Sequence, residues 1–68
     1  MDRSTKNRIV KGILGLADEP RPPGCRKVLS EEGVWRIRTG DWRVGYEIND
    51  IGREITIIRI AHRREFYS

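Results

Sequence analysis

The chain has 68 residues, of which 14 are Lys or Arg and 10 are Asp or Glu, so its formal net charge is +4. This length predicts one small domain, residues 1–68, and the share of apolar residues is typical of a folded chain. A single Cys and a single His exclude a zinc site of ordinary ligand number, so neither metal nor cofactor is expected. No apolar run approaches the ~20 residues that span a bilayer, and the first residues lack the apolar stretch of a signal peptide, which predicts a cytoplasmic protein without a membrane partner.

The basic residues are mostly arginine, with only three lysines among the 14. From Trp35 onward every basic residue is Arg. The planar guanidinium group matches a phosphate better than an ammonium group does, so this choice favours a phosphate-bearing partner. The alternative is that these arginines extend into solvent or pair with nearby acids such as Asp41, Glu47 and Glu65.

A helix is predicted from about Thr5 to Ala17. Its apolar residues recur at spacings of three and four, which places them in one stripe: Ile9, Val10, Ile13, Leu14, Leu16 and Ala17. Ser4 is expected to cap its N-terminus. The proline-rich segment 18–24 ends the helix, because proline lacks an amide proton and disfavours helix in the residue before it.

Beyond this segment the apolar period changes to two, which indicates strands. Residues 34–38 and 42–48 alternate around a Gly-Asp turn and predict a hairpin. A second turn at 49–52 leads to an isoleucine-rich strand, 54–62. Because this last strand is apolar on both faces, it is expected at the centre of a sheet or covered on both sides.

The predicted fold is α+β, a three-stranded antiparallel meander with one helix packed on one face. Strand alternation places Trp35, Trp42 and Tyr46 on the apolar face, where core packing is expected. The opposite face receives basic side chains, and five arginines would converge on it if the last strand continues the pattern: Arg36, Arg38, Arg43, Arg59 and Arg63. Gly45, also on that face, indicates either a bulge or room for a nucleotide.

Two linked runs resemble the RelE/ParE superfamily of toxin–antitoxin toxins. Residues 33–48 combine an aromatic-basic-apolar-basic strand, a Gly-Asp turn and an aromatic-Arg strand that leads to Tyr46. Residues 59–67 end in His-Arg-Arg followed by Tyr67. The resemblance covers nearly the whole chain from the helix onward. It implies the toxin of a type II system, a metal-independent endoribonuclease that cuts messenger RNA on the ribosome and is silenced by a cognate antitoxin.

The resemblance assigns roles to individual residues of this chain. Arg43, Arg63 and Tyr67 take the catalytic positions. Arg36 and Arg38 take the substrate-binding positions, and Arg59 joins them because it is expected on the same face. Where RelE has lysines in the hairpin pair, this chain has arginines, which are poor proton acceptors, so the general base is not identified. His62 is expected on the core side of the last strand, which favours Tyr67 as the proton carrier.

The usual fold of the superfamily begins with a strand and a helix that have no counterpart in this chain. We expect a sheet edge and part of the helix stripe to be uncovered, which predicts a homodimer or an obligate complex with the antitoxin. Three alternatives to the nuclease remain: a ParE-like poison of DNA gyrase, an inactive remnant that only binds its antitoxin, and a basic binding module without catalysis.

Overall fold

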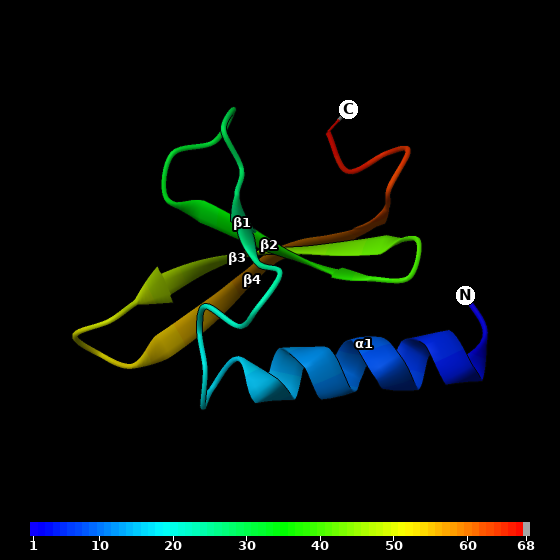
Figure 1. The fold of residues 1–68 in the computed structure, drawn as a ribbon, viewed down its shortest axis with the longest axis horizontal. Coiled ribbons are helices and arrows are strands. Elements are labelled where there is room, and N and C mark those ends of the chain that lie inside the picture. The colour runs from blue at the N-terminus through cyan, green and yellow to red at the C-terminus, as the bar shows by residue number, and fades with distance from the viewer. Residues whose placement is uncertain (68) are drawn as a thin grey trace.

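The computed structural model describes residues 1–67 and contains one helix and a four-stranded antiparallel sheet (Figure 1). The elements are α1 (Arg3–Gly15), β1 (Arg26–Lys27), β2 (Val34–Thr39), β3 (Trp42–Asn49) and β4 (Glu54–His62). The sheet has the order β1-β2-β3-β4, and α1 lies across one of its faces. The predicted α+β meander is confirmed, with a short additional strand, β1, beside β2.

The helix begins two residues earlier than the sequence pattern predicts. Asp2, not Ser4, is its N-cap, because the Asp2 carboxylate accepts a hydrogen bond from the Thr5 N–H at 2.8 Å. This bond satisfies one of the N–H groups that a helix leaves unpaired at its start. The bond also lowers the pKa of Asp2. The helix ends at Gly15, with Leu16 as its C-cap.

The main core lies between α1 and the sheet. Ile9 and Leu16 of the helical segment pack against Ile37, Val44 and Tyr46, all of which are buried. The two tryptophans of the hairpin are partly buried against the same cluster, so the predicted core positions on this face are confirmed. The helix lies against β2 and β3 and not against β4, so part of the β4 surface stays uncovered.

β4 is an edge strand, contrary to the central position expected from its apolar character. It pairs with β3 alone, and its side chains Ile58 and Ile60 are 41% and 42% exposed. The expectation is wrong because an apolar strand can be central or it can present an apolar surface for association, and the alternation pattern does not distinguish the two cases.

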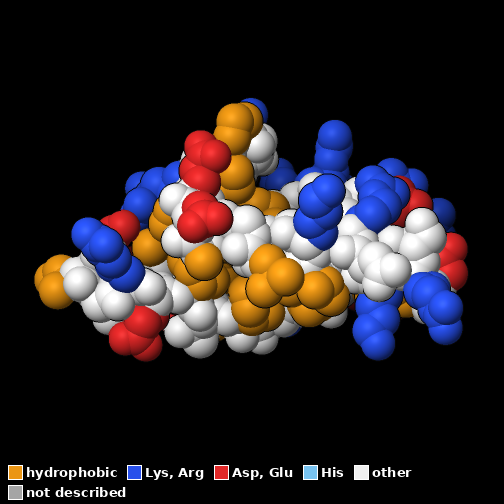
Figure 2. Space-filling view, turned by 90° about the horizontal axis from the view of Figure 1, so that it is seen from below, with side chains coloured by type: hydrophobic (Ala, Val, Ile, Leu, Met, Phe, Trp, Pro, Cys, Tyr) orange, Lys and Arg blue, Asp and Glu red, His pale blue; other side chains and the backbone are white. Residues whose placement is uncertain are grey.

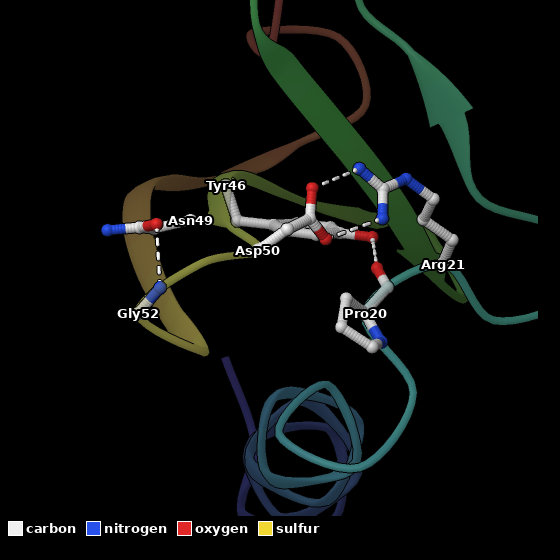
Figure 3. Close-up of polar contacts among 6 residues, drawn as sticks. All are labelled: Pro20, Arg21, Tyr46, Asn49, Asp50 and Gly52. Atoms are coloured by element: carbon white, nitrogen blue, oxygen red, sulfur yellow. Dashed lines mark hydrogen bonds and ion pairs between the residues drawn. The ribbon is translucent and has the colours of Figure 1, made fainter.

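The proline-rich loop is attached to the sheet by polar contacts (Figure 3). The hydroxyl group of buried Tyr46 donates a hydrogen bond to the carbonyl of Pro20 at 2.7 Å. Arg21 forms two hydrogen bonds to the carboxylate of Asp50, at 3.0 and 3.1 Å, which hold the loop to the β3–β4 turn. This loop leads directly into β1, so these contacts also help to place Arg26.

Tyr46 gives the fold a testable dependence on pH. Burial, with the nearby Cys25, raises the pKa of Tyr46 to about 12 from its ordinary value of 10.0. Between these two values the unfolded chain loses the phenol proton while the folded chain keeps it, so stability falls as pH rises, by about 1.4 kcal/mol per pH unit. We expect Tyr46→Phe to be less stable than the wild type by about 1 kcal/mol near neutral pH, because the bond to Pro20 is lost.

In alkali the order of stability should reverse, and Tyr46→Phe should become more stable than the wild type. The phenylalanine variant has no phenol proton to lose, so its stability does not fall through this group. Urea unfolding of both proteins on either side of pH 10 measures this difference in the free energy of unfolding. A stability difference that stays constant with pH would contradict a buried, hydrogen-bonded phenol.

Candidate functional site

Arginine side chains gather on the sheet face that points away from α1. In the antiparallel register Arg36 lies opposite Gly45, and Arg38 lies opposite Arg43. Partners in such a register point to the same face. β1 adds Arg26, which pairs with Arg36. The predicted clustering of Arg36, Arg38 and Arg43 on this face is therefore confirmed, and Arg26 joins them.

These arginines surround an open hollow of about 430 Å³. Its lining consists of Pro23, Gly24, Arg26, Arg36, Ile37, Arg38 and Arg43. Within residues 1–67 no carboxylate lines this hollow, and none of its four arginines forms an ion pair. Like charges gathered without counter-charges destabilise the free fold, so the hollow is suited to an anionic ligand that would neutralise them. We call it the arginine hollow.

Arg43 is the most constrained of the four. Its Nη1 donates hydrogen bonds to the carbonyls of Gly40 and Trp42, both at 3.1 Å, which hold the guanidinium against the β2–β3 turn. Gly40 has φ +59°, a conformation that this tight turn requires and that glycine adopts without strain. Partial burial, followed by the charges of Arg36 and Arg38, lowers the pKa of Arg43 from its ordinary value.

Arg63 and Tyr67 approach this face from the segment after β4. The Arg63 N–H bonds the carbonyl of Asp41 at 2.7 Å, and its Nε lies 3.7 Å from the Asp41 carboxylate. Both side chains are more than half exposed, so this ion pair is weak and open to exchange for another anion. Tyr67, 58% exposed, lines a second hollow together with Arg26 and Arg36.

A model of the ParE toxin of type II toxin–antitoxin systems (parDE) matches residues 2–67. The chain belongs to this toxin family. Its fold is similar to a chain in the crystal structure of the RelB-RelE antitoxin–toxin complex from Methanococcus jannaschii, with a TM-score of 0.69 and 25% sequence identity. The match covers 98% of this chain and 80% of that chain. A search of curated proteins found no significant match. The resemblance to the RelE/ParE superfamily is thus confirmed.

In this ParE-family toxin, Arg59 lies on the same face but does not line the arginine hollow. Its two terminal nitrogens bond the carboxylate of Glu31, at 2.8 and 3.2 Å, and its Nε bonds the carbonyl of Phe66 at 3.1 Å. The guanidinium carbon lies 4.4 Å from the centre of the Phe66 ring. Arg59 thus connects the loop before β2, through Glu31, to the C-terminal segment, through Phe66.

Phe66 also occupies the space beside Gly45. A Cβ added at Gly45 would lie 3.1 Å from the Phe66 ring, so glycine is required here for close packing. The β3–β4 register shifts between Gly45 and Tyr46, which confirms the bulge. The room left by Gly45 is filled by the toxin's own Phe66, and no nucleotide can enter there. Because Tyr67 follows Phe66 and its ring contacts that of Phe66 edge-on at 4.9 Å, this packing positions Tyr67.

His62 lies on the helix-facing side of the sheet, as predicted. It pairs with Trp42 in the register, their rings meet edge-on at 5.8 Å, and its Nδ1 accepts the Arg64 N–H at 3.3 Å. His62 is thus directed away from the arginine hollow. Within residues 1–67 no three His, Cys, Asp or Glu side chains gather as a metal site requires. In the same part of the toxin no helix is long and apolar enough to cross a membrane.

Arg26 is the functional candidate that sequence reasoning missed. Its strand has two residues, too short for any alternation pattern, and it follows a proline-rich loop. In the sequence, the only indication of a role for Arg26 was its position directly after this loop. Its position depends on pairing with β2, a contact between segments ten residues apart.

Proposed function

We propose that this toxin is an endoribonuclease that cuts messenger RNA on the ribosome. One observation carries the proposal: Arg26, Arg36, Arg38 and Arg43 surround a hollow that no carboxylate of residues 1–67 lines, and Tyr67 lies beside it. A phosphodiester has the charge and the oxygen geometry that clustered guanidinium groups bind best.

The proposed reaction is attack of an RNA 2′-oxygen on its neighbouring phosphorus. The bond to the 5′-oxygen breaks, a 2′,3′-cyclic phosphate forms, and the proton lost by the 2′-hydroxyl is balanced by one gained at the leaving 5′-oxygen. The transition state carries extra negative charge on the phosphate, and positioned cationic donors stabilise it. Arg43, fixed by two backbone carbonyls, is suited to this role.

The remaining candidates take complementary roles in this proposal. Arg36 and Arg38 bind the substrate phosphates, and Arg63 exchanges its weak pairing with Asp41 for the scissile phosphate. Tyr67 orients the base beside the cut or carries a proton. Arg59, proposed from the sequence as a substrate contact, acts here by holding Phe66 and hence Tyr67.

The decisive experiment is primer-extension mapping of messenger RNA in a purified translation system. We expect codon-phased cuts with the wild type and their loss, by about 10²-fold or more, in Arg63→Ala and Tyr67→Phe, because each removes a group placed at the reacting phosphate or base. Circular dichroism of each variant checks that it is folded.

Arg53→Asn is the matched control for loss of charge. Arg53 lies in the β3–β4 turn with φ 56°, a conformation that Asn tolerates, and it lines none of the hollows described above. This variant should cut at the wild-type rate. Intact messages from a folded wild-type protein would contradict the nuclease.

The second candidate is a poison of DNA gyrase without nuclease activity. The match to the ParE toxin model favours it. This reading requires protein contacts with gyrase and leaves the unpaired arginines without a role. Inhibition of gyrase supercoiling and induction of DNA damage, with messages left intact, would select it. A folded protein inactive in both assays would indicate the remnant that only binds its antitoxin.

We also propose that a cognate antitoxin restrains this toxin in the cytoplasm, where ribosomes are found. The similar RelE structure was solved as a complex with RelB. The free edge of β4, with exposed Ile58 and Ile60, and the exposed Val10 and Leu14 of α1 offer apolar surface for such a partner. The homodimer predicted from the sequence would use the same surface and therefore compete with the antitoxin.

A further inference from the structure

Helix α1 carries an unusual distribution of charge. It contains Arg3, Lys6, Arg8 and Lys11 and no carboxylate, and its first turn has no acidic residue. The N-terminal end of a helix has partial positive charge, so cations there are unfavourable. Asp2, the N-cap, is the only acid beside them. The helix is less stable for this arrangement, which indicates that its basic side chains have a role outside the fold.

Arg8 and Lys11 line a hollow of about 560 Å³ at the β2–β3 turn. They are three residues apart, so they share one side of α1. The same hollow is lined by Gly12, Arg38, Thr39 and Gly40. A Cβ at Gly40 would lie 3.8 Å from Nη1 of Arg8, which places this guanidinium group directly over the turn. None of the described residues that line this hollow carries a carboxylate.

Arg38 lines both this hollow and the arginine hollow, so the two form one surface. We call this surface the cationic track and define it by five side chains that form no ion pair within residues 1–67: Arg26, Arg36, Arg38, Arg8 and Lys11. By contrast, Arg21, Arg59 and Arg63 each face a carboxylate. Figure 2, viewed from the helix side, shows basic side chains at both ends of the molecule, more of them toward one end, and apolar ones along its middle.

The track passes the edge of the sheet where the backbone of β2 is open. β1 pairs with β2 only at Trp35 and Arg36, so residues 37–39 have no strand partner on that side within the described chain. Unpaired backbone N–H groups at an edge can donate to phosphate or sugar oxygens. Because alternate residues of an antiparallel strand direct their N–H groups to opposite sides, the open edge adds one backbone donor, at Arg38, between the two hollows.

We propose that the cationic track binds an extended single strand of RNA, with Arg8 and Lys11 holding phosphates that flank those in the arginine hollow. This inference rests on the proposed function and extends its binding site from the sheet to the helix. The track bends from one face of the sheet to the other side within a molecule of 35 × 25 × 18 Å. A single strand can follow such a bend, whereas duplex DNA, with a persistence length of about 150 base pairs, resists it.

The test measures binding of 2′-O-methyl oligoribonucleotides, which cannot be cut, by fluorescence anisotropy over a range of salt concentrations. A probe of about 3 nucleotides can occupy one hollow, whereas a probe of about 12 nucleotides can extend along the whole track. With the longer probe, Arg8→Ala/Lys11→Ala should reduce the slope of log K against log salt by about 1.4, because each lost single-strand phosphate contact contributes about 0.7. With the shorter probe the slope should change little.

Arg3→Ala/Lys6→Ala is the matched control, because it removes the same charge from the same helix and neither residue lines the two hollows. An equal loss of slope in both double variants would overturn the track, since net charge alone would then explain binding. An unchanged slope in Arg8→Ala/Lys11→Ala, or equally strong binding of a DNA duplex of the same length, would overturn it too.

Failure of the track and failure of the nuclease are distinguishable. If the wild type cuts messages but Arg8→Ala/Lys11→Ala binds the longer probe with the wild-type slope, the nuclease proposal is supported and the proposed track is contradicted. If the slopes of log K against log salt support the track but no message is cut, the track is an RNA-binding surface and the nuclease proposal is contradicted.

Discussion

Replacing Arg43 with alanine is expected to lower the rate of messenger RNA cleavage by about 10²–10³-fold. Arg43 is held by the carbonyls of Gly40 and Trp42 and lies among the charges of Arg36 and Arg38. A donor fixed in this way need not reorganise as charge develops on the phosphate, and removal of such a donor has effects of this size in other enzymes. Primer extension under single-turnover conditions measures the rate.

The same substitution should leave stability nearly unchanged, within about 0.5 kcal/mol. It removes two hydrogen bonds to backbone carbonyls, but it also removes a cation whose pKa is lowered by partial burial and by neighbouring arginines. Arg43→Ala is therefore expected to lower the cleavage rate without lowering the free energy of unfolding to a comparable extent. Arg43→Lys keeps the charge but not the planar fork and should recover part of the rate. A folded Arg43→Ala protein that cuts at the wild-type rate would remove Arg43 from the catalytic set.

Replacing Phe66 with alanine is expected to reduce the free energy of unfolding by about 3–5 kcal/mol. Phe66 is 1% exposed and packs with Val28, Val34 and Ala61 in a second core cluster, on the face opposite α1. Small domains have total stabilities of about 5–15 kcal/mol, so this loss removes much of the folded population. Urea unfolding followed by tryptophan fluorescence measures it.

Tyr67→Ala is the matched control for this prediction. Its ring is 58% exposed, so its loss should change the free energy of unfolding by less than about 0.5 kcal/mol. Phe66→Leu, which leaves a smaller void, should lie between the two. A Phe66→Ala protein with wild-type stability would show that the C-terminal segment does not contribute to the core, and Tyr67 would then have no fixed position.

The sequence by itself determined which face of the hairpin strands β2 and β3 carries which side chains. Alternation placed Tyr46 and Val44 toward the helix and Arg36, Arg38 and Arg43 away from it, and the structure confirms both sets. The reason is that the strand period of two is a local property, independent of which strands pair. The hairpin at Gly40 and Asp41 was predictable for the same reason, since its turn chemistry lies within a few residues.

Only the tertiary structure decided which side chains meet across the chain. Pairing of β1 brings Arg26 beside Arg36, and the loop before β2 supplies Glu31, which engages Arg59. Neither contact leaves a periodic signal, because each joins segments that come close only when the sheet and its loops assemble. β4 illustrates the same limit: its isoleucines predicted an apolar environment, but whether another strand covers them depends on sheet order, which local hydrophobicity does not encode.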